Sequence, residues 1–334
     1  MFINYVVCTG QHDDMVLSVL SIFEITPDRW FSLRDKKKHH TLQSMTAQIQ
    51  LDMADTIEDL NPDYVIVQGD TISAMTSAVA AFYSKVKVIH IEAGLRSFNM
   101  SEPFPEEFNR KNISSIADFN FTTTHKAYRN LRDEKIDPSK CFYVGNTLVD
   151  AYQIITNKRN IQRKKKYIIV TCHRRENWEK PLKELCKFLK TLKKEKVIFF
   201  THPNPITYNQ VINTLKDTPI EIKISVSYIK FVEYMAHAKI IITDSGGIQE
   251  EASFLGISTL VYRNVTERPE GLEGPLILVG NCTKTLGTCM EKLLYDEEFY
   301  DSKEKRITCY GDGDTSKKIV ETIRRIEIEK EKQP

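Results

Sequence analysis

Short β-branched runs alternate with helical segments along the chain, and this alternation constrains the fold more than any other feature. Residues 64–68, 167–171 and 258–262 are apolar runs of strand length. The segments between such runs carry apolar residues at the spacing of about 3.6 that marks one face of a helix, as at residues 41–60. The alternation predicts an α/β fold built from doubly wound parallel sheets.

The chain of 334 residues is long enough for two domains. A polar, basic and aperiodic run at residues 157–166 interrupts the alternation, and it lacks the aromatic neighbours and the wider basic face of a nucleic-acid site. We interpret it as a solvated linker between a first Rossmann-like domain at residues 1–158 and a second at residues 167–315. A last helix at residues 316–334 is expected to pack back across the first domain. A second basic run, at residues 34–40, is interpreted as an exposed loop.

Charge and composition exclude several classes of protein. The 47 basic and 45 acidic residues leave a net charge of +2, which argues against a nucleic-acid partner. No apolar run approaches the roughly 20 residues of a membrane span, and the first residues do not resemble a signal peptide. The seven cysteines include no CxxC pair, so neither a disulfide framework nor a zinc site is expected. We expect a cytoplasmic protein without a membrane partner.

Acidic residues follow two of the predicted strands of the first domain. Asp70 comes after the strand at residues 64–68, and Glu92 after the strand at 86–91. Open α/β sheets bind their ligands at the carboxyl ends of strands, so both carboxylates are candidates for a functional site. The alternative is that each is only a helix cap. Glu106 and Arg110 are four residues apart and share a helix face, where a surface ion pair is the simpler explanation.

The second domain contains a candidate phosphate site. Asp244-Ser-Gly-Gly-Ile-Gln-Glu-Glu251 follows an apolar strand and leads into a helix, so the backbone N–H groups and the positive end of the helix dipole face one point. Glycine leaves that point open because it has no Cβ. A tight turn without a ligand is the alternative for the glycine pair alone. The strand at 167–171 is followed by His173, Arg174 and Arg175, which add a titratable imidazole and two cations.

Six motifs in this order resemble the non-hydrolysing UDP-N-acetylglucosamine 2-epimerases. They are Gly69-Asp-Thr71, Glu92-Ala-Gly-Leu-Arg96, Pro105-Glu-Glu-Phe-Asn-Arg110, His173-Arg-Arg-Glu-Asn177, Asp244-Ser-Gly-Gly-Ile-Gln-Glu-Glu251 and Thr266-Glu-Arg-Pro-Glu270. The resemblance implies a glycosyltransferase-B architecture, with two doubly wound domains and the substrate in the cleft. It implies interconversion of UDP-GlcNAc and UDP-ManNAc with no metal, nicotinamide or other cofactor. We also expect a homodimer that supplies ManNAc units for surface polysaccharide or glycan synthesis.

The resemblance also assigns roles to individual residues. The C2 proton of the sugar is not acidic, so departure of UDP and formation of a 2-acetamidoglucal intermediate must accompany its removal, and such chemistry needs carboxylates and cations. By resemblance the catalytic residues are Asp70, Glu92, Glu106 and His173. By resemblance the substrate-binding residues are Arg110, Phe231, Ser245, Gly246, Gly247, Glu251 and Arg268. An activating UDP-GlcNAc site is implied at Gln11, Arg174 and His202, with weaker activation expected because Asp14 and His39 replace other partners.

The sequence departs from the family pattern at the start of the chain. Family members begin with a strand, a Gly-Thr-Arg-Pro-Glu loop and a helix before the strand that matches residues 2–8. Without that opening unit, we expect the strands at residues 2–8 and 64–68 to have unpaired backbone edges. Two alternatives to the epimerase stay open, and the missing opening unit suggests the second. One is a hydrolysing relative that releases ManNAc and UDP, and the other is a weakened nucleotide-sugar-binding regulatory homologue.

Overall fold

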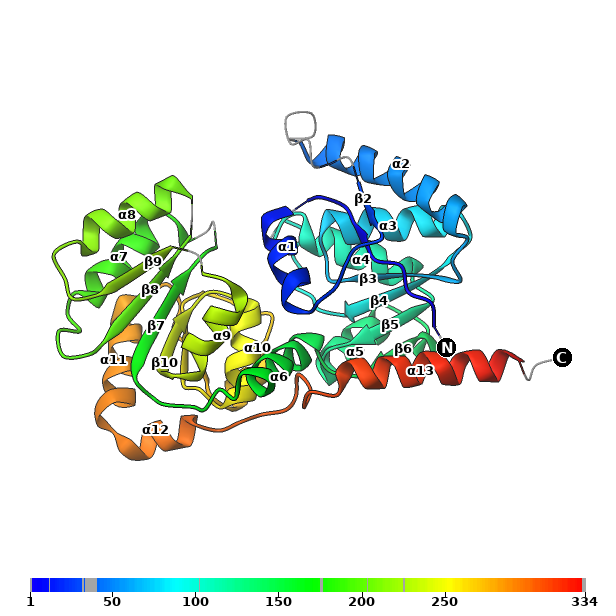
Figure 1. The fold of residues 1–334 in the computed structure, drawn as a ribbon. Coiled ribbons are helices and arrows are strands. Elements are labelled where there is room, and N and C mark those ends of the chain that lie inside the picture. The colour runs from blue at the N-terminus through cyan, green and yellow to red at the C-terminus, as the bar shows by residue number, and fades with distance from the viewer. Residues whose placement is uncertain are drawn as a thin grey trace. The chain divides into compact units, whose positions relative to one another are not determined.

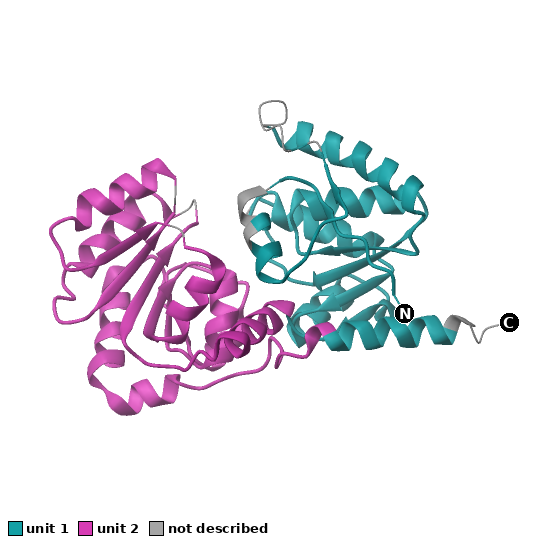
Figure 2. Cartoon of the chain, in the orientation of Figure 1, with its two compact units in different colours: residues 1–146, 317–334 teal, residues 147–316 magenta. Residues whose placement is uncertain are grey.

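The computed structural model describes residues 2–11, 13–31, 33, 41–101, 103–174, 177–202, 204–224 and 226–331. The chain forms two compact units, which are coloured separately in Figure 2. Unit 1 contains residues 1–146 and 317–334, and unit 2 contains residues 147–316. The basic run at 34–40 lies outside the described residues.

Unit 1 is an α/β unit with parallel strands (Figure 1). One sheet has the strand order β3-β4-β5-β6, and a separate two-stranded sheet pairs β1 with β2. The strands are β1 (Val7–Cys8), β2 (Arg29–Trp30), β3 (Tyr64–Gln68), β4 (Lys87–Ala93), β5 (Phe119–Thr122) and β6 (Cys141–Tyr143). The helices are α1 (Asp13–Ile22), α2 (Leu42–Leu60), α3 (Ile72–Tyr83), α4 (Glu106–Ile116), α5 (His125–Asp133) and, from Lys317 on, α13 (Thr315–Glu331).

Helix α2 shows how local sequence sets an element. The Thr41 side chain accepts a hydrogen bond from the backbone N–H of Ser44 and caps the first turn. Ile49, Met53 and Ile57 recur at a spacing of four and are buried. The helix ends where Asn61 adopts a left-handed conformation with φ +42°. The helix predicted at residues 41–60 is therefore confirmed.

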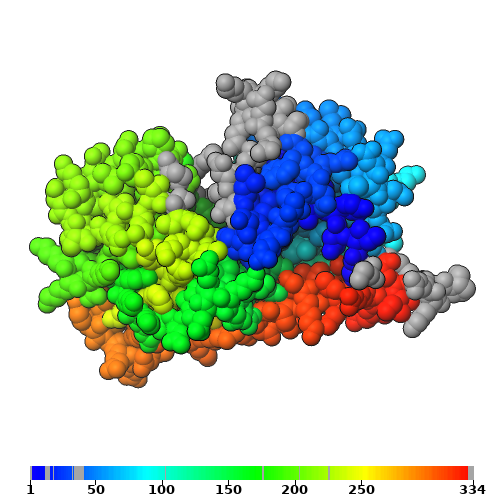
Figure 3. Space-filling view, viewed as in Figure 1, coloured from blue at the N-terminus to red at the C-terminus, as the bar shows by residue number. Residues whose placement is uncertain are grey.

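Apolar side chains cover both faces of the four-stranded sheet. On one face, Val65 and Val67 of β3 belong to a core with residues of α2, α3 and α4. On the other face, Ile89 and Phe121 pack with Ile319 and Ile323 of α13. The outer side of α13 is at the surface, as Figure 3 shows. The last helix therefore completes the core of unit 1.

The start of the chain forms less strand than its sequence predicts. The strand expected at residues 2–8 is limited to β1, and Phe2, Ile3 and Tyr5 are exposed. A strand needs a neighbour for its backbone groups, and the only described partner of β1 is the two-residue β2. β1 and β3 belong to different sheets, and Ile66 of β3 is 53% exposed. Among the described strands, β3 is at the edge of its sheet and pairs only with β4, so it has the unpaired edge that was expected, whereas β1 pairs with β2.

Unit 2 contains one six-stranded parallel sheet with the order β12-β11-β10-β7-β8-β9. The central strands β7 and β10 are almost entirely buried, with α7, α8 and α11 on one face and α9 and α10 on the other (Figure 1). The strands are β7 (Tyr167–Cys172), β8 (Val197–Thr201), β9 (Glu221–Ile224), β10 (Ala238–Thr243), β11 (Thr259–Val261) and β12 (Leu276–Leu278). The helices are α6 (Thr147–Arg159), α7 (Lys180–Leu189), α8 (Pro205–Leu215), α9 (Tyr228–Ala236), α10 (Gly246–Leu255), α11 (Thr283–Tyr295) and α12 (Glu297–Lys303).

The division between the units lies before α6 and not in the basic run that follows it. α6 packs against α9 and α10, and the rings of Tyr152 and Phe254 lie 6.3 Å apart. These contacts bury the apolar face of α6 in unit 2, so the helix groups with unit 2 although we placed it in the first domain. No helix among the described residues is long and apolar enough to cross a membrane.

We predict that Gly94→Ala destabilises unit 1. Gly94 has φ +85°, and an added Cβ would collide with the carbonyl oxygen of Ala127 and lie 2.7 Å from its carbon. The left-handed conformation costs an alanine about 1–2 kcal/mol, and overpacking adds about 1–3 kcal/mol. Urea denaturation measures the loss. Gly69→Ala is the matched control, because its φ is +72° but its nearest neighbour would be at 3.6 Å. Equal losses from the two variants would contradict the role of the collision.

Candidate active site

The structure brings Asp70 and Glu92 together at the carboxyl ends of two paired strands. β3 and β4 are parallel, with Gln68 opposite Ile91. The N–H of Gly69 donates a hydrogen bond to the carbonyl of Ile91 at 2.9 Å, and a Cβ at Gly69 would lie 3.6 Å from Oε2 of Glu92. The two carboxylates that were predicted from separate motifs therefore lie on either side of Gly69, at the ends of paired strands.

Glu92 has an unusual backbone conformation. Its φ is +66°, and the pairing of β4 with β5 is irregular between Ile91 and Ala93. A non-glycine residue in the left-handed region is uncommon, and such residues cluster at functional sites because the surrounding structure must hold them there. The bulge turns Glu92 out of the strand alternation at the strand end, beside Gly69.

Helix α4 supplies a buried arginine to the same place. Nη2 of Arg110 pairs with Oδ2 of Asp70, and Nη1 lies 3.3 Å from Oε2 of Glu107. The surface pair of Arg110 with Glu106, which was the simpler explanation from spacing, is not among its contacts. Glu106 instead has a buried Oε2 without a hydrogen-bond partner in the described part of the chain, and Nε of Arg110 is also without one.

Glu107 is a buried residue that the sequence pattern did not single out. Its carboxylate accepts the backbone N–H of Ser97 at 2.9 Å and that of Phe98 at 3.1 Å. These bonds hold the loop that follows β4, where Phe98 has φ +60°. Asn109 on the same helix donates to the carbonyl oxygen of Asp70 at 2.8 Å. α4 therefore fixes the backbone after both strands.

His90 supports the turn from inside the unit. Its Nε2 lies 2.9 Å from the carbonyl oxygen of Gly69, and its Nδ1 lies 3.3 Å from Oγ of Ser114. Burial lowers the pKa of His90 to about 4, so the imidazole is neutral at neutral pH. A polar residue inside the apolar run at 88–91 was the sequence signal that could have identified it.

In unit 2 the first turn of α10 is open to an anion. The first N–H groups of a helix have no intrahelical acceptor, and the helix dipole is positive there. Ser245 is at the N-cap position, and its side chain makes no capping hydrogen bond. A Cβ at Gly246 would lie 2.8 Å from Cζ and Nη1 of Arg268, so glycine lets the guanidinium lie against this turn. At Gly247 the nearest side-chain atom would be 3.4 Å away, on Leu148.

Three arginines surround one buried carboxylate beside this turn. Glu267 lies 2.7 Å from Nη1 of Arg263, 3.1 Å from Nη1 of Arg268 and 3.3 Å from Nη2 of Arg174. Burial alone would raise the pKa of Glu267, but the three guanidinium groups lower it to about 2. Nε of Arg268 also donates to Glu250 at 2.8 Å. The two carboxylates hold Arg268 in a single position.

Asp244 joins the loops after β7 and β10. It is fully buried, and its carboxylate accepts the backbone N–H of His173 at 2.9 Å and that of Arg174 at 2.9 Å. The amide Nδ2 of Asn177 donates to it at 2.8 Å. Burial lowers the pKa of His173, although the Asp244 carboxylate acts in the opposite direction. A neutral imidazole is therefore held at the carboxyl end of β7.

Glu251 belongs to α10 and contacts α9, and Phe231 is part of α9. Oη of Tyr228 donates to Oε1 of Glu251 at 2.5 Å, and burial raises the pKa of Glu251 to about 8. Glu251 is therefore largely protonated at neutral pH. The ring of Phe231 packs edge-on against Phe200 with centroids 5.1 Å apart.

Of the three residues expected at an activating site, Gln11 belongs to unit 1, and Arg174 and His202 belong to unit 2. In unit 1, Oε1 of Gln11 accepts hydrogen bonds from the N–H of Ser73 at 3.2 Å and from its hydroxyl at 2.6 Å. In unit 2, the His202 and His173 rings are 5.9 Å apart, and Nδ1 of His202 accepts the N–H of Asn204 at 3.0 Å. His39, Arg175 and the side chain of Asp14 lie outside the described residues.

Comparisons with known proteins agree with the motifs. A family profile described as UDP-N-acetylglucosamine 2-epimerase matches residues 2–324. The UDP-N-acetylglucosamine 2-epimerase of Campylobacter jejuni is 36% identical over 346 residues, covering 96% of this chain and 90% of that protein. The protein of the same name from Bacillus subtilis (strain 168) is 35% identical, and the match covers 96% of this chain and 87% of that protein.

Solved structures show the same fold. The crystal structure of UDP-GlcNAc 2-epimerase from Neisseria meningitidis bound to UDP-GlcNAc matches with a TM-score of 0.90 and 36% identity, covering 96% of this chain and 92% of that chain. The Methanocaldococcus jannaschii UDP-GlcNAc 2-epimerase in complex with UDP-GlcNAc and UDP matches with a TM-score of 0.80 and 28% identity, covering 96% and 91%. The expected fold class, two doubly wound units of the glycosyltransferase-B kind, is confirmed. Since the family profile spans almost the whole chain and relatives exceed 30% identity over nearly all of it, the chain belongs to the UDP-N-acetylglucosamine 2-epimerase family and is an isomerase.

Proposed function

We propose that this protein interconverts UDP-GlcNAc and UDP-ManNAc by inverting C2 through elimination and re-addition of UDP. The observation that carries the proposal is the pair of carboxylates at adjacent strand ends, Asp70 after β3 and Glu92 near the end of β4, with the buried Oε2 of Glu106 on helix α4. A site that only binds a nucleotide sugar has no need of three carboxylates near a strained strand end. That the Neisseria meningitidis relative was solved with UDP-GlcNAc supports the choice of substrate.

The chemistry has to remove a proton from a carbon that is not acidic. In the proposed first step, the bond between C1 and the diphosphate oxygen breaks, and its electron pair leaves with UDP. Positive charge develops at C1, so the C2 proton can pass to a carboxylate, and 2-acetamidoglucal forms. In the second step a proton adds to the opposite face of C2, and the diphosphate oxygen attacks C1. The two steps balance, because the proton and the UDP that leave are both replaced.

We assign the proton transfers and the stabilisation of C1 to Asp70, Glu92 and Glu106. General acid–base groups need to be positioned more than they need an unusual environment, and Arg110 and Asn109 hold Asp70 through its side chain and its carbonyl. Arg110 was expected to contact the pyrophosphate. Two carboxylates engage its Nη atoms, and its buried Nε has no hydrogen-bond partner in the described part of the chain. We propose that its first role is to orient Asp70.

In unit 2 we assign the diphosphate to the first turn of α10. Gly246 and Gly247 supply N–H groups, and Arg268 supplies a charge-assisted donor. Ser245 supplies its hydroxyl, because its own N–H donates to Oγ1 of Thr243 at 3.0 Å. His173 is neutral and can donate a hydrogen bond to the leaving diphosphate. A protonated Glu251 can both donate to and accept from ribose hydroxyls, and Phe231 offers an aromatic face to uracil. The expected homodimer and the supply of ManNAc units to glycan synthesis stay predictions.

Proton NMR in D₂O tests the reaction. We expect UDP-GlcNAc incubated with the protein to gain deuterium at C2 and to form UDP-ManNAc with UDP retained, because the proton that returns to C2 comes from solvent through a carboxylate. Free ManNAc with UDP would instead identify the hydrolysing alternative. Saturable binding without exchange would identify a binding protein and refute the proposal.

We predict that Asp70→Asn and Glu92→Gln each lower turnover at least ~10²-fold, the usual scale for a positioned acid–base group. Calorimetry with UDP should show unchanged affinity, because the diphosphate site lies in unit 2. Asp59→Asn is a matched control, since Asp59 also pairs with an arginine, Arg29 at 3.0 Å, but at the surface. Near-normal C2 exchange in either active-site variant would remove that residue from the catalytic group.

We predict that Arg268→Ala and Gly247→Ala each weaken UDP binding by roughly 10-fold or more, the scale of one charge-assisted hydrogen bond. The first removes a donor, and the second adds a methyl group where phosphate must approach the backbone. Titration calorimetry with UDP alone gives the affinities. Arg306→Ala is the control, because its guanidinium stacks on Phe254, 4.1 Å from the ring centroid, near the other end of α10. Unaltered affinity in both test variants would place the diphosphate elsewhere.

A further inference from the structure

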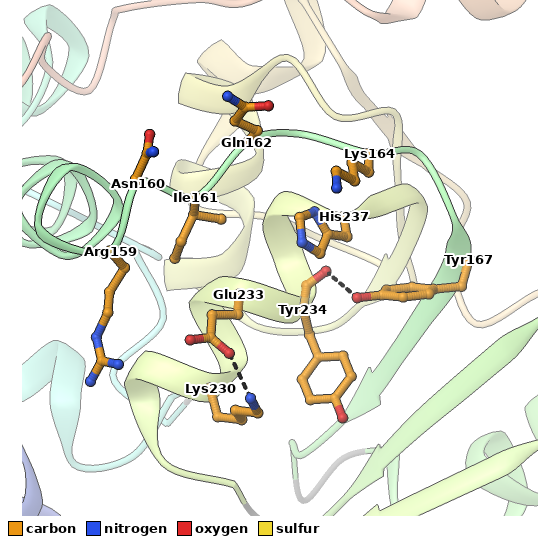
Figure 4. Close-up of a pocket in the computed structure, with 10 residues that line it drawn as sticks. All are labelled: Arg159, Asn160, Ile161, Gln162, Lys164, Tyr167, Lys230, Glu233, Tyr234 and His237. Carbon is orange, nitrogen blue, oxygen red and sulfur yellow. Dashed lines mark hydrogen bonds and ion pairs between the residues drawn. The ribbon is translucent and has the colours of Figure 1, made fainter.

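Unit 2 contains a hollow that the proposed reaction does not use. It is a basic pocket of about 490 Å³ between the end of α6, the loop that leads to β7, and helix α9 (Figure 4). This volume is within the range of about 300–1,000 Å³ of small-molecule sites. The pocket is lined by Arg159, Asn160, Ile161, Gln162, Lys164, Tyr167, Lys230, Glu233, Tyr234 and His237.

The pocket lies at the opposite edge of the sheet from the diphosphate site. Tyr167 is the first residue of β7, and His237 immediately precedes β10. The α10 turn follows the last residue of β10, and the two strands are parallel. A ligand in the basic pocket would therefore bind at the amino ends of the strands. Its binding residues are distinct from Ser245, Gly246 and Arg268.

The basic residues in the loop between α6 and β7 differ in whether they form ion pairs. Arg163 lies 2.7 Å from Oε1 of Glu304, and Lys165 pairs with Oε2 of the same residue. Lys164, between them, lines the pocket and has no ion pair among the described residues, and the same holds for Arg159. The loop that we interpret from sequence as a solvated linker therefore directs part of its positive charge into a hollow.

The other charged groups of the pocket leave this excess in place. Lys230 and Glu233 pair with each other at 2.7 Å, so they contribute no net charge. Burial lowers the pKa of His237, and the charges of Lys166 and Lys164 lower it further, while Glu233 acts in the opposite direction. The imidazole is neutral at neutral pH, and its Nδ1 is buried without a hydrogen-bond partner in the described part of the chain.

One wall of the pocket suits an organic group. The rings of Tyr167 and Tyr234 lie 6.0 Å apart, and the hydroxyl of Tyr167 donates to the carbonyl oxygen of Tyr234 at 3.1 Å. Ile161 adds an aliphatic side chain at the loop (Figure 4). Amides of Asn160 and Gln162 provide neutral donors and acceptors. Cations and apolar groups line the same hollow, a combination that fits an organic ligand that carries an anionic group.

We propose that this basic pocket binds a small molecule that carries a phosphate or diphosphate group. Arg159 and Lys164 would contact the phosphate oxygens, because guanidinium and ammonium groups are the usual donors to phosphate in proteins. Ile161 and the tyrosine pair would pack against the organic part. The site binds independently of the diphosphate site at α10.

Titration calorimetry with inorganic pyrophosphate tests the proposal on the full chain. Saturating UDP is present throughout, so that the α10 turn is already filled. We expect wild-type protein to bind one further pyrophosphate per chain. Arg159→Gln and Lys164→Gln should each weaken that binding about 10-fold, the scale of a charge-assisted hydrogen bond. Both side chains are exposed, so neither substitution opens a core.

Lys165→Gln is the matched control for Lys164→Gln. It removes the same charge from the next position of the same loop, but from the side that faces Glu304. We expect pyrophosphate affinity within about twofold of wild type for this control, and unchanged UDP affinity for all three variants. Absence of saturable pyrophosphate binding in the UDP-saturated wild type would overturn the proposal. Equal weakening by Lys164→Gln and Lys165→Gln would also overturn it, since that result indicates general surface charge.

Discussion

The buried carboxylate of Asp244 is the contact on which the functional end of unit 2 depends. A fully buried charge is costly unless hydrogen bonds satisfy it, and this one is satisfied by the backbone of His173 and Arg174 and by the amide of Asn177. One residue at the end of β10 thereby fixes the loop after β7. The position of the His173 imidazole and the start of the α10 turn follow from the same contact.

In unit 1 a buried carboxylate also holds the loop after a strand through backbone N–H groups. Buried Glu107 holds the loop after β4 through two backbone N–H groups, and Arg110 links it to Asp70 after β3. Each unit therefore has an acidic residue that joins two strand ends, Asp244 or Glu107, next to acidic or basic residues that we propose bind the substrate. A motif rich in carboxylates can therefore contain carboxylates that hold a loop and carboxylates that are proposed to act on the substrate. Truncating a residue that joins the loops would misplace the others without touching the ligand.

Several features of the fold were predictable because they depend on local sequence. The strand at residues 64–68 coincides with β3, and the phosphate-site candidate lies between β10 and α10 as expected. Residues 2–8 have equally strong strand character, but only Val7–Cys8 form β1. β-structure needs a hydrogen-bonding partner, and local propensity cannot supply one. The boundary of the units differed from expectation for a related reason, since packing of α6 on α9 and α10 decided it.

The sequence by itself determined the alternation of strands and helices and the motifs that carry carboxylates, cations and glycines, because periodicity and turn chemistry are local properties. It therefore also determined the family. Only the tertiary structure decided that Arg110 pairs with Asp70 and Glu107 and not with Glu106, that Asp244 binds the loop of His173, and that Lys164 and Lys165 face opposite ways. Those outcomes depend on which side chains are buried together. Residues adjacent in sequence carry no information about that until the strands are paired.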